Sequence, residues 1–263
     1  MGCPLRSEPM AGLHGRIFHV NVNCSDLETS LAFYRDRVGL AASVRTTPRR
    51  PQGGAAFGLK TAQWDAWIMS GGGPDEVVLD LLEWKVPRPS HARDPGGFRR
   101  LRVGAHPDSL LASERAVDPD GTALELVARD RPRVAGVVVG CSDLGASQAF
   151  YRDVLGLSSS GPSTYADGRG PEVFSIELTS VAAAPRPRVA TDLGLYRLAM
   201  LTDDLDHDYD ALTAAGVRPY SPPASLDMGP GLPQLRALCF PDPDGTTFEL
   251  IEQPAVGNVA DLG

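Results

Sequence analysis

Two segments of the sequence are near copies of each other. Residues 24–40 and 141–157 both read Cys-Ser-Asp-Leu, then Ala-Phe-Tyr-Arg-Asp and, a few positions later, Gly-Leu. A second pair, at 118–126 and 242–250, begins with Asp-Pro-Asp-Gly and ends with Glu-Leu. The copies of the first pair lie about 117 residues apart, and an internal repeat of this length indicates two related domains in one chain.

The composition supports two globular domains and excludes some partners. The chain has 263 residues, of which 42% are hydrophobic, so each half can bury a core of its own. A formal net charge of -8 disfavours nucleic acid and anionic membranes as partners, because their phosphates bind clustered Lys and Arg. No run reaches the roughly 20 apolar residues of a membrane span, and residues 1–10 lack a signal-peptide core. We therefore predict a cytoplasmic protein, and the sequence leaves open whether it is a monomer or a homodimer.

The cysteine pattern favours buried thiols over a metal site. The four cysteines are Cys3, Cys24, Cys141 and Cys239, and none forms a Cys-x-x-Cys pair. Cys24 and Cys141 end matching apolar strands, so we expect free buried thiols in a reducing compartment.

The local patterns predict a repeating unit of one strand, one helix and three strands. Residues 16–24 alternate apolar and polar side chains, as a half-buried strand does. Ser25 or Asp26 can cap a helix that ends before Gly39. Short apolar stretches broken by Gly and Pro follow, and the same order returns from residue 134 onward.

A further unit begins within each half, at 97–101 and at 194–198. In the first half this unit is short, because only about 17 residues separate Arg100 from the Asp-Pro-Asp-Gly turn, so residues 107–113 can supply little more than two helical turns. We predict four segments along the chain: a tail at 1–15, a first domain at 16–130 with a truncated second unit, a second domain at 134–253, and a tail at 254–263. Residues 221–233, rich in Pro and Gly, are a candidate flap over the second domain's site.

This arrangement resembles the vicinal oxygen chelate superfamily, which includes glyoxalase I, extradiol dioxygenases, fosfomycin-resistance enzymes, methylmalonyl-CoA epimerase and bleomycin-binding proteins. The resemblance covers about 16–130 and 134–253 and implies an α+β fold. Paired βαβββ units would form cupped, half-open β-barrels with the site inside each cup. Because the fold carries several chemistries, it does not by itself imply one reaction.

The resemblance also implies where metal ligands would lie, on the first and last strands of each unit. The residues of this chain at those positions are His19, Asp80, Arg100, Glu125, Gly136, Glu177, Arg197 and Glu249. An Arg side chain is always protonated and has no lone pair for a metal, so the two Arg favour cups without a metal. An Arg facing carboxylates would instead form a bidentate ion pair.

How the four units pair decides which residues meet, and the sequence leaves this open. Adjacent pairing would bring together His19, Asp80 and Glu125, an acceptable ligand set for Zn²⁺, Fe²⁺ or Mn²⁺. Exchanged pairing would instead join His19 and Asp80 with Arg197 and Glu249.

We expect an enzyme acting on a small oxygenated metabolite by metal-independent isomerase, lyase or cyclase chemistry through an enolate-like intermediate. Glu249 or Glu177 would be the acid/base group and Arg197 would hold the negative charge, with His19 as a further base. Substrate contacts are expected from Arg100, Tyr196 and Trp67. The alternatives are a protein that sequesters an antibiotic or pathway intermediate, a metal-dependent glyoxalase or extradiol dioxygenase, and a scaffold with vestigial cups.

Overall fold

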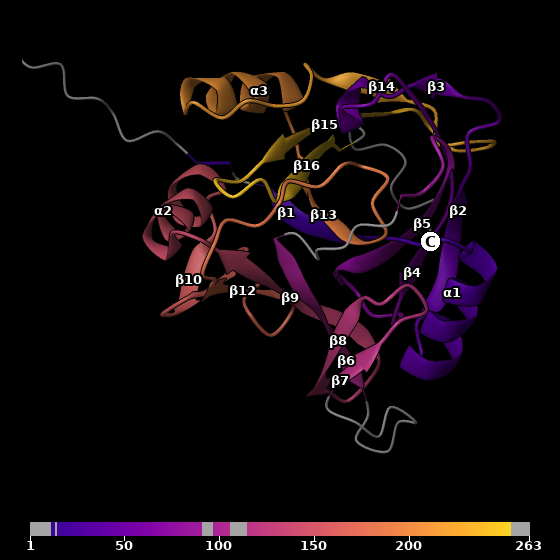
Figure 1. Cartoon of the computed structure of the whole chain (residues 1–263), viewed down its shortest axis with the longest axis horizontal. Coiled ribbons are helices and arrows are strands. Elements are labelled where there is room, and N and C mark those ends of the chain that lie inside the picture. Colours follow the sequence, from indigo (N-terminus) through magenta and orange to yellow (C-terminus); the bar gives the residue numbers. More distant parts are fainter. Residues whose placement is uncertain (1–11, 14, 91–96, 106–114, 254–263) are drawn as a thin grey trace, which may run out of the picture.

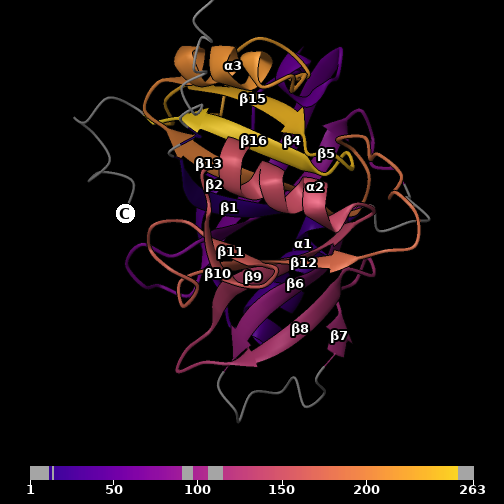
Figure 2. The same ribbon diagram turned by 90° about the vertical axis from the view of Figure 1, so that its left-hand side faces the viewer.

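The computed structural model describes residues 12–13, 15–90, 97–105 and 115–253. Within these residues the strands form two curled sheets, one of nine strands and one of seven, which lie one above the other in the view of Figure 2. Three α-helices pack against the sheets (Figure 1). The predicted α+β class with cupped sheets is confirmed.

The centre of the larger sheet is formed by two neighbouring strands, each of which is the first strand of a repeating unit. Its order is β14 (Ala224–Leu226), β15 (Leu235–Pro241), β16 (Thr247–Glu252), β13 (Gly194–Thr202), β1 (Arg16–Asn23), β5 (Val78–Val86), β4 (Thr61–Ser70) and β2 (Ala41–Thr46), with β3 (Gln52–Gly53) beside β4.

The smaller sheet is built in the same way from the middle of the chain. Its order is β10 (Ser158–Gly161), β11 (Thr164–Ala166), β12 (Ser175–Ser180), β9 (Arg133–Cys141), β6 (Phe98–Ala105), β8 (Ala123–Ala128) and β7 (Arg115–Val117). The two helical turns expected at 107–113 lie outside the described residues, as do most of the tail expected at 1–15 and the whole of that at 254–263.

The units pair by exchange between the two sequence repeats. β1 pairs antiparallel with β13, and β6 pairs antiparallel with β9. Each sheet therefore contains one unit from residues 16–130 and one from 134–253. Pairing two first strands covers an edge on each that would otherwise leave backbone groups unpaired. Of the two pairings that the sequence leaves open, this is the exchanged one.

Aspartates cap the three helices. They are α1 (Leu27–Phe33), α2 (Leu144–Ala149) and α3 (Leu205–Ala214), and their caps Asp26, Asp143 and Asp204 each accept a hydrogen bond from a backbone N–H in the first turn. α1 and α2 continue through wider π-helical turns as far as Val38 and Val154. The helices thus begin where the Asp-Leu motif predicts.

A tyrosine of each Phe-Tyr motif ties the two sheets together. The Tyr34 hydroxyl donates to Asp118 Oδ2 at 3.0 Å, and the Tyr151 hydroxyl donates to Asp242 Oδ2 at 3.1 Å. Each acceptor is the first residue of an Asp-Pro-Asp-Gly turn in the other sheet. The two repeated motifs are therefore in contact.

Strand alternation separates the main core from the inside of the larger cup. On β5, Leu79 and Leu81 belong to the main core, which draws apolar side chains from both sheets, whereas Asp80 and Leu82 line the inside of the larger sheet. Cys24 and Cys141 are buried and free as predicted, and Cys239 is too. Across the part of the chain that the structure describes, no helix has the length and apolar character needed to cross a membrane.

Candidate functional site

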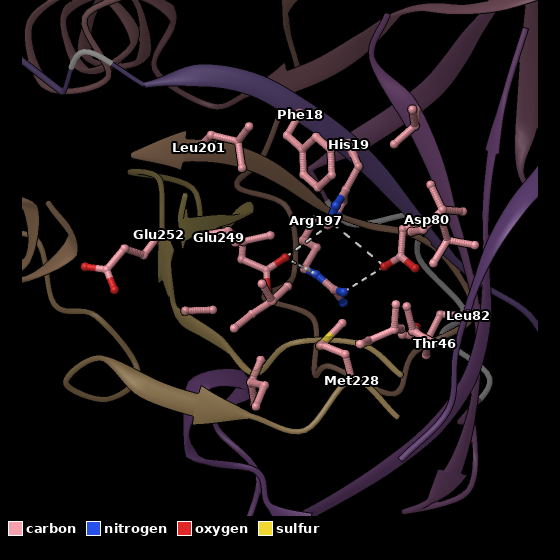
Figure 3. Close-up of a pocket in the computed structure, with 18 of the residues that line it drawn as sticks. Phe18, His19, Thr46, Asp80, Leu82, Arg197, Leu201, Met228, Glu249 and Glu252 are labelled. Carbon is pink, nitrogen blue, oxygen red and sulfur yellow. Dashed lines mark hydrogen bonds and ion pairs between the residues drawn. The ribbon is translucent and has the colours of Figure 1, made fainter. Parts of the chain in front are cut away.

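The concave face of the larger sheet encloses a cavity of about 450 Å³ (Figure 3). Apolar side chains from both repeats make up most of its wall, and they are Phe18, Val44, Phe57, Trp64, Ile68, Val78, Leu82, Leu201, Leu226, Met228, Leu232, Pro233, Leu235, Ala237 and Ile251. A pocket of this size and character suits a small, largely apolar organic molecule.

Four polar side chains gather in this cavity, one from each of the four central strands. His19 comes from β1, Asp80 from β5, Arg197 from β13 and Glu249 from β16. A bulge at Phe18 shifts the register of β1 against β13, and both Phe18 and His19 line the cavity as a result. Bulges of this kind commonly re-aim a side chain beside a functional site.

Arg197 bridges the two carboxylates. Its Nη2 donates to Asp80 Oδ2 at 2.8 Å and its Nε donates to Glu249 Oε2 at 2.7 Å. Asp80 also accepts a hydrogen bond from Asn21 Nδ2 at 3.0 Å. The three ionic side chains are only 3–6% exposed, so each charge depends on its partners.

His19 lies beside this ion-pair bridge without a hydrogen bond of its own. Its Nε2 is 3.3 Å from Glu249 Oε2 and 3.8 Å from Asp80 Oδ2 (Figure 3). Neither imidazole nitrogen has a hydrogen-bond partner among the described residues, and Arg197 Nη1 likewise has none. Buried polar atoms are nearly always paired, so His19 Nδ1 and Arg197 Nη1, which face neither carboxylate at these distances, are available to a ligand.

The contacts of the bridge shift the pKa values of Glu249 and Arg197. Burial works against the charged form of Glu249, but Arg197 and His19 outweigh it and lower the pKa of Glu249 to about 2. Burial likewise opposes the charge on Arg197, yet Glu249 and Asp80 raise the pKa of Arg197 above its ordinary value. Arg197 and Glu249 are therefore both charged near neutral pH.

The smaller sheet holds a related but more exposed ion-pair cluster. Arg102 Nε donates to Glu125 Oε1 at 2.9 Å and Arg102 Nη2 donates to Glu177 Oε2 at 2.5 Å. Arg100 reaches only to 3.8 Å from Glu125. Gly136 stands where His19 stands in the larger sheet, so this cluster has no imidazole.

The structure therefore divides the predicted site residues between two places. His19, Asp80, Arg197 and Glu249 meet in the cavity, whereas Glu125, Glu177 and Arg100 lie in the other sheet. The predicted ligand set of His19, Asp80 and Glu125 does not assemble, because the exchanged pairing carries Glu125 away from the other two.

None of the three expected substrate contacts, Arg100, Tyr196 and Trp67, lines the cavity, and Arg100 belongs to the smaller sheet. Tyr196 is buried within the wall, and Trp67 points to the opposite face of β4, where Arg45 lies 5.6 Å from its ring centroid. The aromatic lining comes instead from Phe18, Phe57 and Trp64.

Sequence reasoning missed Asn21 and Arg102. Both follow a predicted site position by two residues, on the same face of the same strand, so strand alternation is the signal that could have found them. In the parallel pairing of β6 with β8, Arg102 is the residue opposite Glu125, whereas Ala199 is opposite Glu249 in the larger sheet.

The segment 221–233 lies over this cavity. Met228, Leu232 and Pro233 line it, the backbone oxygen of Met228 accepts a hydrogen bond from Thr47 N–H, and Gln52 bonds with the backbone of Asp227. Because Thr47 and Gln52 belong to the first repeat, the segment covers a cup that both repeats share. Its expected mobility stays a prediction.

A divalent metal does not fit the polar cluster as it stands. The guanidinium of Arg197 lies between the two carboxylates that would bind the ion, and it would repel a second cation. Among the residues that the structure describes, no three His, Cys, Asp or Glu side chains are arranged to hold a metal ion.

The second sequence repeat matches a known protein family. A sequence model of the Glyoxalase/Bleomycin resistance protein/Dioxygenase superfamily matches residues 133–250. Residues 133–250 therefore belong to this superfamily, the vicinal oxygen chelate proteins, and each sheet contains units from both sequence repeats.

Solved structures share the fold over nearly the whole chain. Glyoxalase I from Zea mays is 18% identical, with a TM-score of 0.64 over 90% of this chain and 92% of that chain. A putative dioxygenase from Bacillus subtilis is 15% identical, with a TM-score of 0.64 over 93% and 87%. At these identities the likeness concerns the fold alone. A comparison with curated proteins finds no match.

Proposed function

We propose that this protein is an enzyme that binds a neutral, largely apolar carbonyl compound in the larger cup and moves a proton at the carbon next to the carbonyl. The observation that carries the proposal is the buried imidazole of His19 in a mostly apolar cavity, with Nε2 beside two carboxylates and Nδ1 without a hydrogen-bond partner among the described residues. A buried imidazole nitrogen that accepts no hydrogen bond is a candidate proton acceptor.

The charges of the cluster favour a neutral substrate. Arg197 brings one positive charge to two carboxylates, so the cup has no surplus of positive charge to hold an anion. Arg197 Nη1 can still donate a hydrogen bond to a carbonyl oxygen. We therefore expect Arg197 to donate one hydrogen bond to the substrate, and not to bind an anionic group as the sequence suggested.

The proposed proton transfer needs only the substrate and the side chains of the larger cup. The substrate C–H bond breaks, its proton forms an N–H bond on His19, and the electron pair moves to the carbonyl oxygen to give an enolate. Glu249, 3.3 Å from His19, stabilises the imidazolium that forms, while Arg197 Nη1 donates to the enolate oxygen. Return of the proton to another atom gives isomerisation, and loss of a leaving group gives elimination.

Hydrogen–deuterium exchange tests this step without knowledge of the natural substrate. A panel of neutral cyclic ketones and 1,3-dicarbonyl compounds is incubated with the protein in D₂O, and loss of the α-proton signal is followed by NMR. The wild type should speed up exchange of at least one compound, and His19→Gln should remove the effect while still binding that compound. The matched control is Glu177→Gln in the smaller sheet, which should exchange like the wild type.

The rival function is sequestration of an apolar small molecule, and the size and apolar lining of the cavity favour it equally. Saturable binding of a panel member, with no exchange above that in buffer, would decide for this binding function.

A further inference from the structure

The polar cluster of the larger cup is arranged around a cation, and the protein itself supplies that cation. Asp80 Oδ2 and Glu249 Oε2 both face the guanidinium of Arg197, at 2.8 and 2.7 Å. His19 Nε2 approaches the same two oxygen atoms (Figure 3). Three potential donor atoms thus converge on the region that the guanidinium occupies.

The separations between these atoms are close to those of a metal site. Ligand atoms about 2.0 Å from a tetrahedral Zn²⁺ ion lie roughly 3.3 Å from one another. His19 Nε2 is 3.3 Å from Glu249 Oε2 and 3.8 Å from Asp80 Oδ2. Two of the three separations in a triad of one imidazole and two carboxylates are thus close to those between ligands of one ion.

The surroundings support the same interpretation. Asn21, fully buried, donates to the Asp80 carboxylate at 3.0 Å, and such outer contacts orient metal-binding carboxylates. Removal of Arg197 would leave two buried negative charges without a cation. A divalent ion would neutralise both.

We propose that the Arg197 guanidinium is a built-in replacement for a divalent metal, and that His19, Asp80 and Glu249 form a metal-binding triad once it is removed. The proposal does not depend on the reaction that the cup performs.

The smaller sheet provides an internal control. Arg102 bridges Glu125 and Glu177 in the same manner, but Gly136 stands in place of the imidazole. A side chain cannot be added there without a shift, because a Cβ on Gly136 would lie 2.4 Å from the backbone oxygen of Ser175. Removal of Arg102 therefore exposes two carboxylates and no complete triad.

The test is Co²⁺ binding by the full-length protein, measured by titration calorimetry and by the visible absorption of the bound ion. Arg197→Ala should bind one Co²⁺ per chain at least tenfold more tightly than wild type or Arg102→Ala, and adding His19→Ala should abolish the gain. The same variant should gain thermal stability from Co²⁺ and from millimolar guanidinium ion, whereas the wild type should gain from neither.

Two results would overturn the proposal. One is Co²⁺ binding by Arg197→Ala that is no tighter than that of the wild type or that persists without His19. The other is His19-dependent Co²⁺ binding by the wild type itself. If Arg197→Ala does not fold in the absence of Co²⁺, the same Co²⁺ binding measurements are made with Arg197→Gln, whose side chain fills more of the vacated space.

Discussion

His19 Nε2 lies 3.3 Å from Glu249 Oε2, although one residue is near the start of the chain and the other near its end. Their contact follows from the antiparallel pairing of β1 with β13 and the parallel pairing of β13 with β16. Neither repeat alone contains the four polar residues of the larger cup. The candidate site is therefore a property of the whole chain.

Glu249→Gln should destabilise the protein strongly, because it leaves Arg197 buried with one carboxylate partner in place of two. The expected loss in the free energy of unfolding is about 3–5 kcal/mol, measured by urea denaturation. The counterpart Glu125→Gln in the smaller sheet should cost about 1 kcal/mol or less, since Glu125 is 27% exposed. Equal losses would show that burial does not distinguish the two clusters.

The exchanged pairing predicts energetic coupling between residues of different repeats. In a double-mutant cycle, Asp80→Asn and Arg197→Gln should be non-additive by more than about 1 kcal/mol in unfolding free energy, because the two side chains share a hydrogen bond at 2.8 Å. The control cycle of Glu177→Gln with Arg197→Gln should be additive within about 0.5 kcal/mol. Strong coupling in the control cycle instead would indicate adjacent pairing.

Stability should fall as the pH rises through the range in which Asp242 ionises. Burial raises the pKa of Asp242 to about 6, only partly offset by hydrogen bonds from Thr246, Asp244 and Tyr151. The folded state therefore holds this proton more tightly than the unfolded chain. The contribution is complete below about pH 4 and is lost through about pH 6, with a size of about 3 kcal/mol. Urea denaturation across this range should show the slope, and Asp242→Asn should reduce it.

Glu249 should have the opposite effect in a more acidic range. Because its pKa is lowered to about 2 in the folded protein, its contribution is present above about pH 4.5 and is lost as the pH falls through about 2. In Glu249→Gln, the free energy of unfolding, measured by urea denaturation, should therefore fall less steeply as the pH is lowered from about 4.5 to about 2. An unchanged dependence on pH in this variant would contradict the assigned ion pair.

Much of the local structure could be predicted from the sequence, because it depends on contacts between near neighbours. Asp26 and Asp143 cap helices as their Asp-Leu motifs indicate, and strand alternation places Asp80 and Glu249 inside a cup. Two residues of the polar clusters, Asn21 and Arg102, were not predicted, although each lies two residues after a predicted site position. Arg102 takes the part expected of Arg100, because Arg102 is the residue that pairs directly with Glu125 across β6 and β8, where the larger sheet has Ala199 opposite Glu249.

The repeat, the strand-helix-strand units, the α+β fold and the residue types available to each cup all follow from the amino-acid sequence. Which units share a sheet, and therefore which residues meet, becomes clear only in the folded protein. The physical reason is that β1, β6, β9 and β13 are similar first strands with open edges, so either pairing satisfies their local patterns. The choice between the pairings separates Glu125 from His19 and places Arg197 between Asp80 and Glu249.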